Sequence, residues 1–220
     1  MISVAIDGPA GAGKSTISKQ LAKKLEFIYV DTGALYRATG LKFLRMGYDT
    51  KLECDIDAVL KTTKIDIKFI DGEQRVFLDE EDVSELIRTP EASMMASAVS
   101  AKPPVRAFLL EMQRKLAREN NVIMDGRDIG TVVLPNAEVK IFLTASVETR
   151  ANRRFIELKE RGSHATYEEV LDDMKVRDYN DSHREIAPLK PANDSVVVDT
   201  SELNFEESVK TLYDIIKEKM

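Results

Sequence analysis

Residues 8–15 (GPAGAGKS) constrain the fold more than any other part of the chain. They fit the pattern G-x-x-x-x-G-K-[ST], which requires a buried strand before it and a helix after it. The apolar run 2–6 (ISVAI) fits the strand, and Ile17, Leu21 and Leu25 share one face of the helix that follows. The sequence therefore predicts a phosphate-binding loop and a bound nucleoside triphosphate.

The composition of this loop explains how it can hold phosphates. Gly8 and Gly13 allow a backbone path and a close approach that a side chain would block. The backbone N–H groups and the helix N-terminus then face the phosphate oxygens. Lys14 can reach the outer phosphates, and the Ser15 hydroxyl can bind Mg²⁺. The predicted triphosphate site comprises Gly8, Pro9, Ala10, Gly11, Ala12, Gly13, Lys14, Ser15 and Thr16.

Further apolar runs predict the rest of the sheet. Helix-like patterns separate most of these runs, so we expect a parallel sheet with helices on both faces. Such a sheet binds its ligand at the carboxyl ends of its strands. The additional runs are 27–30, 121–125, 139–143 and 195–199.

Two regions interrupt this alternation. In 64–86, apolar and polar residues alternate around Asp71 and Gly72, which predicts a small antiparallel hairpin. Residues 150–185 are charged and helix-prone, with an interruption at Gly162. This second region is either a solvated pair of helices or a mobile lid.

The composition excludes several classes of protein. The net charge is −6 and there is no strongly basic tract, so we expect no nucleic-acid partner. A single cysteine, Cys54, cannot form an intrachain disulfide, and two histidines make a Cys/His zinc site implausible. No secretory signal or membrane-length apolar run is present. We expect a cytoplasmic monomer that contacts no membrane.

A phosphate loop alone does not identify a reaction, because switches, motors and kinases share it. The Asn-Lys-x-Asp motif by which GTPases recognise guanine is missing, and 100–102 (SAK) is only a weak likeness to another GTPase segment. The chain length suits a small phosphotransferase. Alternatives are another small-molecule kinase, of the uridylate or shikimate type, and a nucleotide-dependent binding or switch protein.

The arginines favour phosphoryl transfer. Transfer between two phosphate-bearing substrates gathers negative charge that positioned cations must neutralise. Arg37 and Arg127 follow the second and third predicted strands. Two groups have a spacing that lets them share one helical face: Arg150, Arg153 and Arg154, and Arg177, Asp181 and Arg184. For the second group the alternative is an i,i+4 salt bridge on a solvated helix.

Residues 125–133 (DGRDIGTVV) follow a buried strand and place two aspartates around one arginine. Their composition is compatible with a metal site, a substrate-binding turn or a charged turn at a strand end.

Four segments carry a resemblance to a known family. IDGPAGAGKST, YVDTGALYR, DGRDIGTVVLPNAEVKIFL and RDYNDSHREIAPL, in this order and spacing, closely resemble the bacterial cytidylate kinases. The resemblance runs from residue 2 to about 200, and the 64–86 insertion is typical of the bacterial type. It implies transfer of the γ-phosphoryl group of ATP, with Mg²⁺, to CMP or dCMP.

The resemblance also implies an architecture for a single kinase unit. It predicts a five-stranded parallel sheet of the P-loop NTPase type with a nucleoside-monophosphate-binding region and a helical lid. The core would comprise 1–35, 103–149 and 186–220, the monophosphate-binding region 36–102, and the lid 150–185.

Residue roles follow from the resemblance in the same way. Thr32, Tyr36, Arg37, Arg127 and Arg184 would surround the ribose and phosphate of CMP. Ser97, Arg106 and Asp128 would contact cytosine, and Arg177 and Asp181 the sugar hydroxyls. The lid arginines would be Arg150, Arg154 and Arg161, and the catalytic cations Lys14, Arg127, Arg150 and Arg154. Asp125, at a strand end near the loop, would join Ser15 in organising Mg²⁺ through its water shell.

The chemistry of cytosine agrees with these roles. Cytosine presents an amino donor at position 4 and an unprotonated N3, whereas uracil presents a carbonyl and an N–H. A carboxylate at Asp128 accepts from the amino group, and Arg106 donates to the acceptor edge. Uracil would leave the carboxylate facing a carbonyl oxygen, so we expect a clear preference for CMP over UMP.

Overall fold

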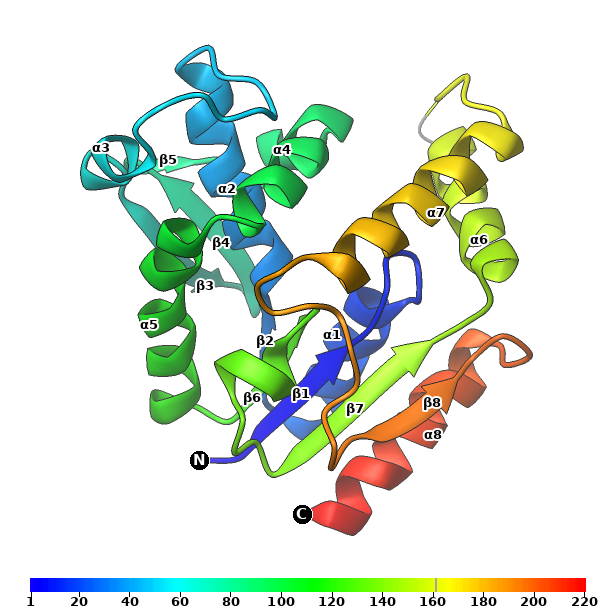
Figure 1. The fold of residues 1–220 in the computed structure, drawn as a ribbon. Helices are drawn as coiled ribbons and strands as arrows, with labels where there is room; N and C mark the ends of the chain where they lie inside the picture. Colours follow the sequence, from blue (N-terminus) through cyan, green and yellow to red (C-terminus); the bar gives the residue numbers. More distant parts are fainter. Residues whose placement is uncertain (161) are drawn as a thin grey trace.

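The computed structural model describes residues 1–160 and 162–220. A parallel sheet with the strand order β2-β6-β1-β7-β8 forms its centre (Figure 1). The five predicted apolar runs are these strands, each within one residue at both ends, so the predicted α/β fold is confirmed. The strands are β1 (Ser3–Asp7), β2 (Ile28–Asp31), β6 (Val122–Gly126), β7 (Val139–Thr144) and β8 (Val196–Asp199).

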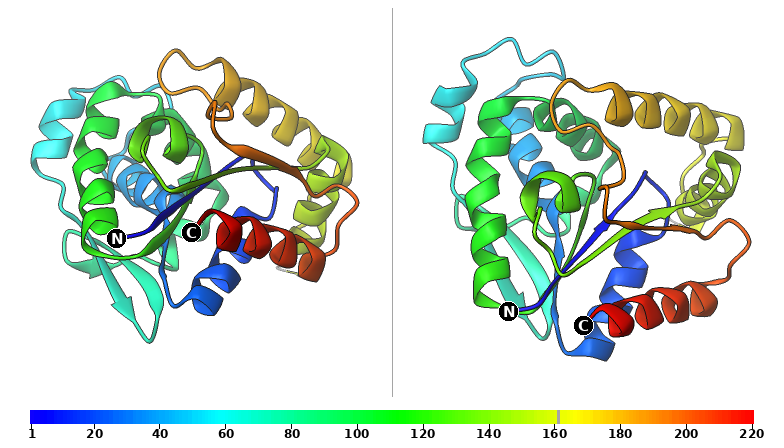
Figure 2. Two further views of the ribbon diagram at one scale, coloured as in Figure 1. Left: turned by 90° about the horizontal axis from the view of Figure 1, so that it is seen from below. Right: turned by 60° about the horizontal axis from the view of Figure 1, so that its bottom comes forward.

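Helices cover both faces of this sheet (Figure 2). On one face, α1 (Lys14–Leu25) and α8 (Phe205–Lys219) pack against Val4 and Ile6 of β1. On the other, α5 (Pro103–Glu119) and the π-helical turn η2 (Ile129–Val133) pack around Ala5. Alternate residues of β1 thus enter two different cores, as expected for a strand buried on both sides.

The region between β2 and α5 contains the predicted hairpin. Strands β3 and β4 are antiparallel, and the turn between them is at Asp71 and Gly72, which both have positive φ values, of 53° and 78°. A third short strand, β5, was not predicted. The elements of this region are α2 (Thr32–Arg45), α3 (Ile56–Lys61), β3 (Ile65–Ile70), β4 (Glu73–Leu78), β5 (Glu81–Asp82), η1 (Leu86–Arg88) and α4 (Pro90–Ser100).

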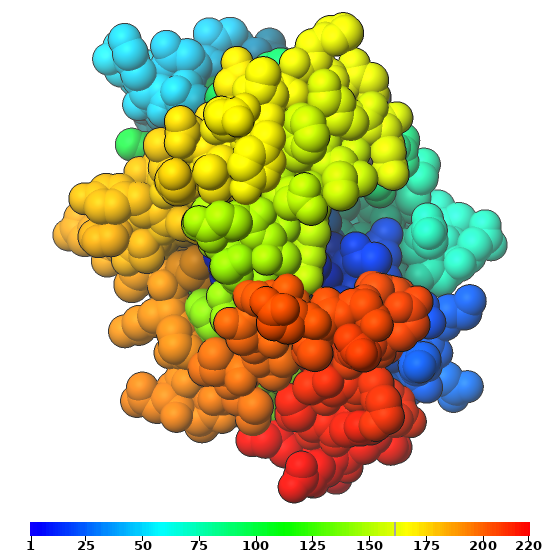
Figure 3. Space-filling model, turned by 90° about the vertical axis from the view of Figure 1, so that its right-hand side faces the viewer, coloured from blue at the N-terminus to red at the C-terminus, as the bar shows by residue number. Residues whose placement is uncertain are grey.

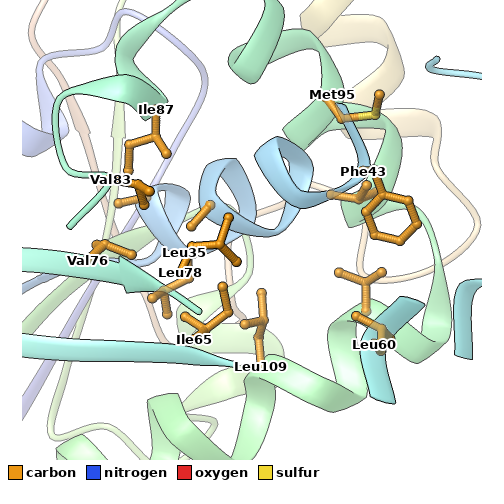
Figure 4. Packing of buried hydrophobic residues seen from close by; sticks show 14 of the residues in the cluster. Leu35, Phe43, Leu60, Ile65, Val76, Leu78, Val83, Ile87, Met95 and Leu109 are labelled. Atoms are coloured by element: carbon orange, nitrogen blue, oxygen red, sulfur yellow. The ribbon is translucent and has the colours of Figure 1, made fainter. Parts of the chain in front are cut away.

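This region has a hydrophobic core of its own (Figure 4). Leu35 and Phe43 of α2 are fully buried there, together with Leu78 of β4, Met95 of α4 and Leu109 of α5. The packing fixes α2 between the hairpin and α4. Since α2 begins at the carboxyl end of β2, its first turn has a defined position beside the central sheet.

The predicted lid region is a pair of packed helices, α6 (Val147–Glu160) and α7 (Tyr167–His183). Ala151, Val170 and Met174 form a small buried core together with Ala10 of the phosphate loop. In Figure 3, residues of α6 and α7 lie above those of β8 and α8. The pair is therefore more than two solvated helices, since it packs against the loop. Within 1–160 and 162–220, no helix is long and apolar enough to cross a membrane.

Candidate active site

The phosphate loop connects β1 to α1, as predicted. Gly8 has a φ of 151°, and a Cβ there would lie 1.9 Å from the backbone oxygen of Leu143, so only glycine fits. Lys14 is 6% exposed, and its Nζ donates to the backbone oxygen of Pro9 at 2.7 Å. Burial and the nearby charge of Arg127 lower the pKa of Lys14 well below its usual value.

Asp125 lies beside the start of α1, as expected from its position at the end of β6. It accepts hydrogen bonds from the Ser15 hydroxyl at 2.8 Å and the Tyr29 hydroxyl at 3.0 Å. Burial, and then the charge of Asp31, raise the pKa of Asp125 to about 6. The structure thus brings Ser15 and Asp125 together. We name residues 8–16 with Asp125 the donor end of the site.

The first two turns of α2 contribute three of the predicted residues. The Thr32 hydroxyl donates to the backbone oxygen of Asp125 at 2.8 Å. Arg37 forms an ion pair with Asp31 at 2.8 Å. The ring of Tyr36 faces the Arg106 guanidinium, with 5.8 Å between the ring centroid and the guanidinium carbon. Helix α2 therefore connects the strand ends to the predicted base site.

Asp128 lies in a buried cluster of arginines. Its carboxylate accepts a hydrogen bond from Arg106 and lies 3.5 Å from a guanidinium nitrogen of Arg184. Burial raises the pKa of Asp128, although both arginines oppose the shift. Arg106 also donates to the backbone oxygen of Ser100 at 3.3 Å, one helical turn after Ser97 on α4.

A second cluster joins segment 126–128 to α7. The Arg127 guanidinium donates to Asp181 at 2.8 Å. Burial, and then the neighbouring charge of Arg127, lower the pKa of Arg177 to about 10, with Arg37 and Arg154 adding to the effect. The charges of Arg127, Arg37 and Arg154 therefore gather around Arg177 and make a positive region suited to phosphate. We name Arg37, Arg127 and Arg177, with Arg106, Asp128, Asp181 and Arg184, the acceptor end.

The arginines of α6 have different environments. Arg150 is buried and donates to the backbone oxygen of Ala10 at 3.0 Å and to Asp178 at 2.6 Å. Arg154 pairs with Glu157 at 2.7 Å. Arg153 instead donates to the backbone oxygen of Thr200 at 2.8 Å. The spacing allowed all three to share a face, but only Arg150 contacts the phosphate loop, and only Arg154 affects the charge of Arg177. Arg161 lies outside the described residues.

The comparisons with known proteins agree with this site. Residues 4–218 match the family model for cytidylate kinase. The chain is 55% identical over 214 residues to a cytidylate kinase of Caldicellulosiruptor bescii, with 97% of this chain and 95% of that one covered. It is 53% identical to a cytidylate kinase of Carboxydothermus hydrogenoformans, with 98% and 97% covered.

The chain belongs to the cytidylate kinase family.

As a member of the cytidylate kinase family, the chain is a nucleoside monophosphate kinase, a phosphotransferase. The resemblance inferred from four sequence segments is thus confirmed, and the alternatives, a uridylate or shikimate type of kinase and a binding or switch protein, are not favoured. A solved shikimate kinase from Bacteroides thetaiotaomicron has a similar structure, with a TM-score of 0.51, 14% identity and 98% of each chain covered. At that identity the likeness shows the shared fold alone.

Sequence reasoning missed several carboxylates that position this cytidylate kinase site. Asp31 pairs with Arg37, and Asp178 holds Arg150. Asp7 accepts from the N–H groups of the turn after Asp128. Asp7 and Asp31 each end a strand at the edge where the ligand site was expected, so the rule that selected Asp125 would also have selected them.

Proposed function

We propose that this chain transfers the γ-phosphoryl group of ATP to CMP and dCMP and so forms CDP and dCDP. The observation that carries the proposal is the buried Asp128 carboxylate between Arg106 and Arg184. A buried acceptor flanked by donors matches the amino group, N3 and carbonyl edge of cytosine. Ser97, on the neighbouring α4, would complete the contacts to the base.

The donor end would bind ATP through backbone N–H groups and Lys14. Ser15 and Asp125 would hold Mg²⁺, which neutralises phosphate charge during transfer when bound. The buried hydroxyl–carboxylate pair fits this ion, because Mg²⁺ in kinases uses few protein ligands and several phosphate and water oxygens. In the part of the chain that the structure describes, no group of three or more His, Cys, Asp and Glu side chains could hold a metal ion by itself.

The acceptor end would bind the nucleoside monophosphate. Thr32, Tyr36, Arg37, Arg127 and Arg184 would surround its phosphate and ribose, and Asp181 with Arg177 would contact the sugar hydroxyls. An acceptor phosphate is already ionised at neutral pH, so the reaction needs no strong general base. The cationic side chains stabilise the charge that develops during transfer.

The proposal also divides the molecule into three working parts. The core (1–35, 103–149 and 186–220) would bind ATP, region 36–102 would bind CMP together with residues of the core and of 150–185, and 150–185 would act as a lid that excludes water. Arg150 contacts the phosphate loop and Arg154 acts on the charge of Arg177, and both would act on the transferring phosphoryl group, together with Arg161. We expect a cytoplasmic monomer that serves pyrimidine nucleotide metabolism.

A panel of acceptors tests this function. The protein is incubated with ATP and Mg²⁺ and, in separate reactions, with CMP, dCMP, UMP, AMP and shikimate, while ADP release is followed by a coupled assay. We expect CMP and dCMP to accelerate ADP formation strongly and UMP much less. Preferred use of UMP or shikimate would contradict the proposal. Slow ATP hydrolysis that no acceptor accelerates would favour a nucleotide-dependent switch.

A further inference from the structure

Asp7 is the last residue of β1 and directly precedes the phosphate loop. One of its carboxylate oxygens accepts from the backbone N–H of Ile129 at 2.7 Å, and the other from that of Gly130 at 2.8 Å. Ile129 directly follows Asp128. One buried side chain, 4% exposed, thus links the start of the donor end to the turn that carries the predicted base contact.

We propose that Asp7 is a positioning residue that fixes Asp128 and Arg127 relative to the phosphate loop. In this role Asp7 contributes to the choice between cytosine and uracil although it lies outside the predicted contacts to either nucleotide. This inference rests on the proposed function, since it names the base that Asp128 would recognise.

The turn η2 depends on contacts from other elements. Its first N–H groups have no acceptor within the turn. The two oxygens of Asp7 accept from two of these groups, those of Ile129 and Gly130. At its other end, Arg114 of α5 donates to the backbone oxygens of Val132 and Val133, both at 3.0 Å. The turn is therefore held at two ends, and the end next to Asp128 is held by Asp7.

The approach of the two segments is close. A Cβ at Gly130 would lie 3.2 Å from the Lys140 side chain and 3.4 Å from a carboxylate oxygen of Asp7. The turn can therefore shift little toward the sheet. It can shift away from the sheet once the hydrogen bonds to Asp7 are lost, and such a shift moves Asp128 relative to Arg106 and Arg184.

The partners of Asp128 lie outside η2. Arg106 belongs to α5, and Arg184 follows α7. A base that pairs with Asp128 and Arg106 together requires a fixed geometry between a carboxylate and a guanidinium that come from separate elements. Asp7 supplies that constraint from the strand side, and the same constraint fixes the distance from the base to the phosphate loop.

The experiment compares Asp7→Asn with wild type and with Arg114→Ala. Asn keeps the size of Asp but turns an N–H₂ group toward one of the two N–H donors. Arg114→Ala is the matched control, because it releases the other end of the same turn. For each protein, kcat and KM are measured with ATP–Mg²⁺ for CMP and UMP, and KM for ATP is measured at saturating CMP.

We expect Asp7→Asn to raise KM for CMP about tenfold and to lower the CMP-to-UMP ratio of kcat/KM about tenfold, the loss of one charged hydrogen bond. KM for ATP should change less than about threefold, as for a separate site. Arg114→Ala should lower the melting temperature and leave the ratio unchanged.

An unchanged ratio in folded Asp7→Asn, or a rise in KM for ATP alone, would overturn the positioning role. Should Asp7→Asn not fold, Asp7→Glu takes its place, because it keeps the charge but moves the oxygens by one carbon. If neither variant folds, Asp7 is a folding determinant and the proposal is rejected. Failure of the wild type to use CMP would instead reject the proposed function and leave the structural link between Asp7 and η2 intact.

Discussion

The donor end and the acceptor end of the site are built in different ways. The donor end is almost contiguous in sequence and relies on the backbone of residues 8–16, with Asp125 as its one distant member. The acceptor end combines side chains from α2, α5, segment 126–128 and α7. A loop that is contiguous in sequence can be predicted from a sequence pattern. A cluster of side chains from several elements forms only in the folded protein, so a pattern does not predict it.

The two ends also differ in the partners of their carboxylates. At the donor end, Asp125 has hydroxyl partners, and burial raises its pKa to about 6. At the acceptor end, burial would raise the pKa of Asp181, but Arg127 and the other arginines lower it below its usual value. Asp125 is therefore suited to an added cation, whereas the arginines around Asp181 are suited to an added anion, which agrees with Mg²⁺ beside Asp125 and a phosphate beside Asp181.

Substitution of Lys14 should give the largest effect and should affect the donor end alone. We expect Lys14→Ala to lower kcat about 10³-fold, because one positioned cation at the transferring group is removed. KM for CMP should change little. ADP formation under saturating substrates measures the loss, with Lys42→Ala, on α2 and paired with Asp79, as the control. A kcat within tenfold of wild type would remove Lys14 from the catalytic group.

A second prediction concerns the pH dependence of stability at Asp7, between the two ends. Burial raises the pKa of Asp7 from 3.8 to about 6, so the folded protein holds a proton that the unfolded chain releases at lower pH. Ionisation of Asp7 therefore lowers the free energy of unfolding as pH rises from about 4 to about 6, by about 3 kcal/mol. Asp7→Asn lacks this contribution.

Urea unfolding at several pH values measures that contribution. Relative to Asp7→Asn, wild type should lose about 3 kcal/mol of stability between pH 4 and pH 7. Arg114→Ala should differ from wild type by a constant amount over the same range. A constant difference for Asp7→Asn as well would show that Asp7 is already ionised near pH 4 in the folded protein.

The sheet and the donor end could be predicted because their signals are local. Each buried strand is a short apolar run, and the loop is a pattern of glycines, Lys14 and Ser15 within eight residues. Asp125 could be predicted too, since a strand end next to the loop is a defined position in a parallel sheet. These inferences used no contact between side chains distant in sequence, and the strand order was not predicted.

The environments of the arginines could not be predicted from spacing. Helical spacing predicted that Arg150, Arg153 and Arg154 share one face of a helix. Arg153 instead donates to the backbone oxygen of Thr200, just after β8. The pairing of Arg150 with Asp178 joins two helices whose packing depends on tertiary contacts. Helical periodicity defines a face, and the neighbouring elements decide which acceptors that face meets.

At the acceptor end, Asp128→Ala should change selectivity. Without the carboxylate, the amino group of cytosine loses its acceptor, and uracil no longer meets an unfavourable oxygen pair. We expect the CMP-to-UMP ratio of kcat/KM to fall about 100-fold. The acceptor panel measures it, with Asp82→Ala as a control, because Asp82 pairs with Arg75 in the β insertion. An unchanged ratio would mean that another group distinguishes the bases.

The smallest effect is expected at Asp181. Its carboxylate pairs with Arg127 and is also predicted to contact the sugar hydroxyls. Asp181→Asn keeps the shape but removes the charge that orients Arg127 at 2.8 Å and offsets Arg177. We expect KM for CMP to rise about tenfold, with kcat less affected, because a charged hydrogen bond that orients the substrate is lost.

Asp173→Asn, on the exposed side of the same helix, should leave KM for CMP unchanged. If Asp181→Asn lowers kcat as strongly as Lys14→Ala does, the two ends are not separate. Arg127, already one of the predicted catalytic cations, then acts on the same transition state as Lys14, and Asp181 affects kcat by orienting Arg127.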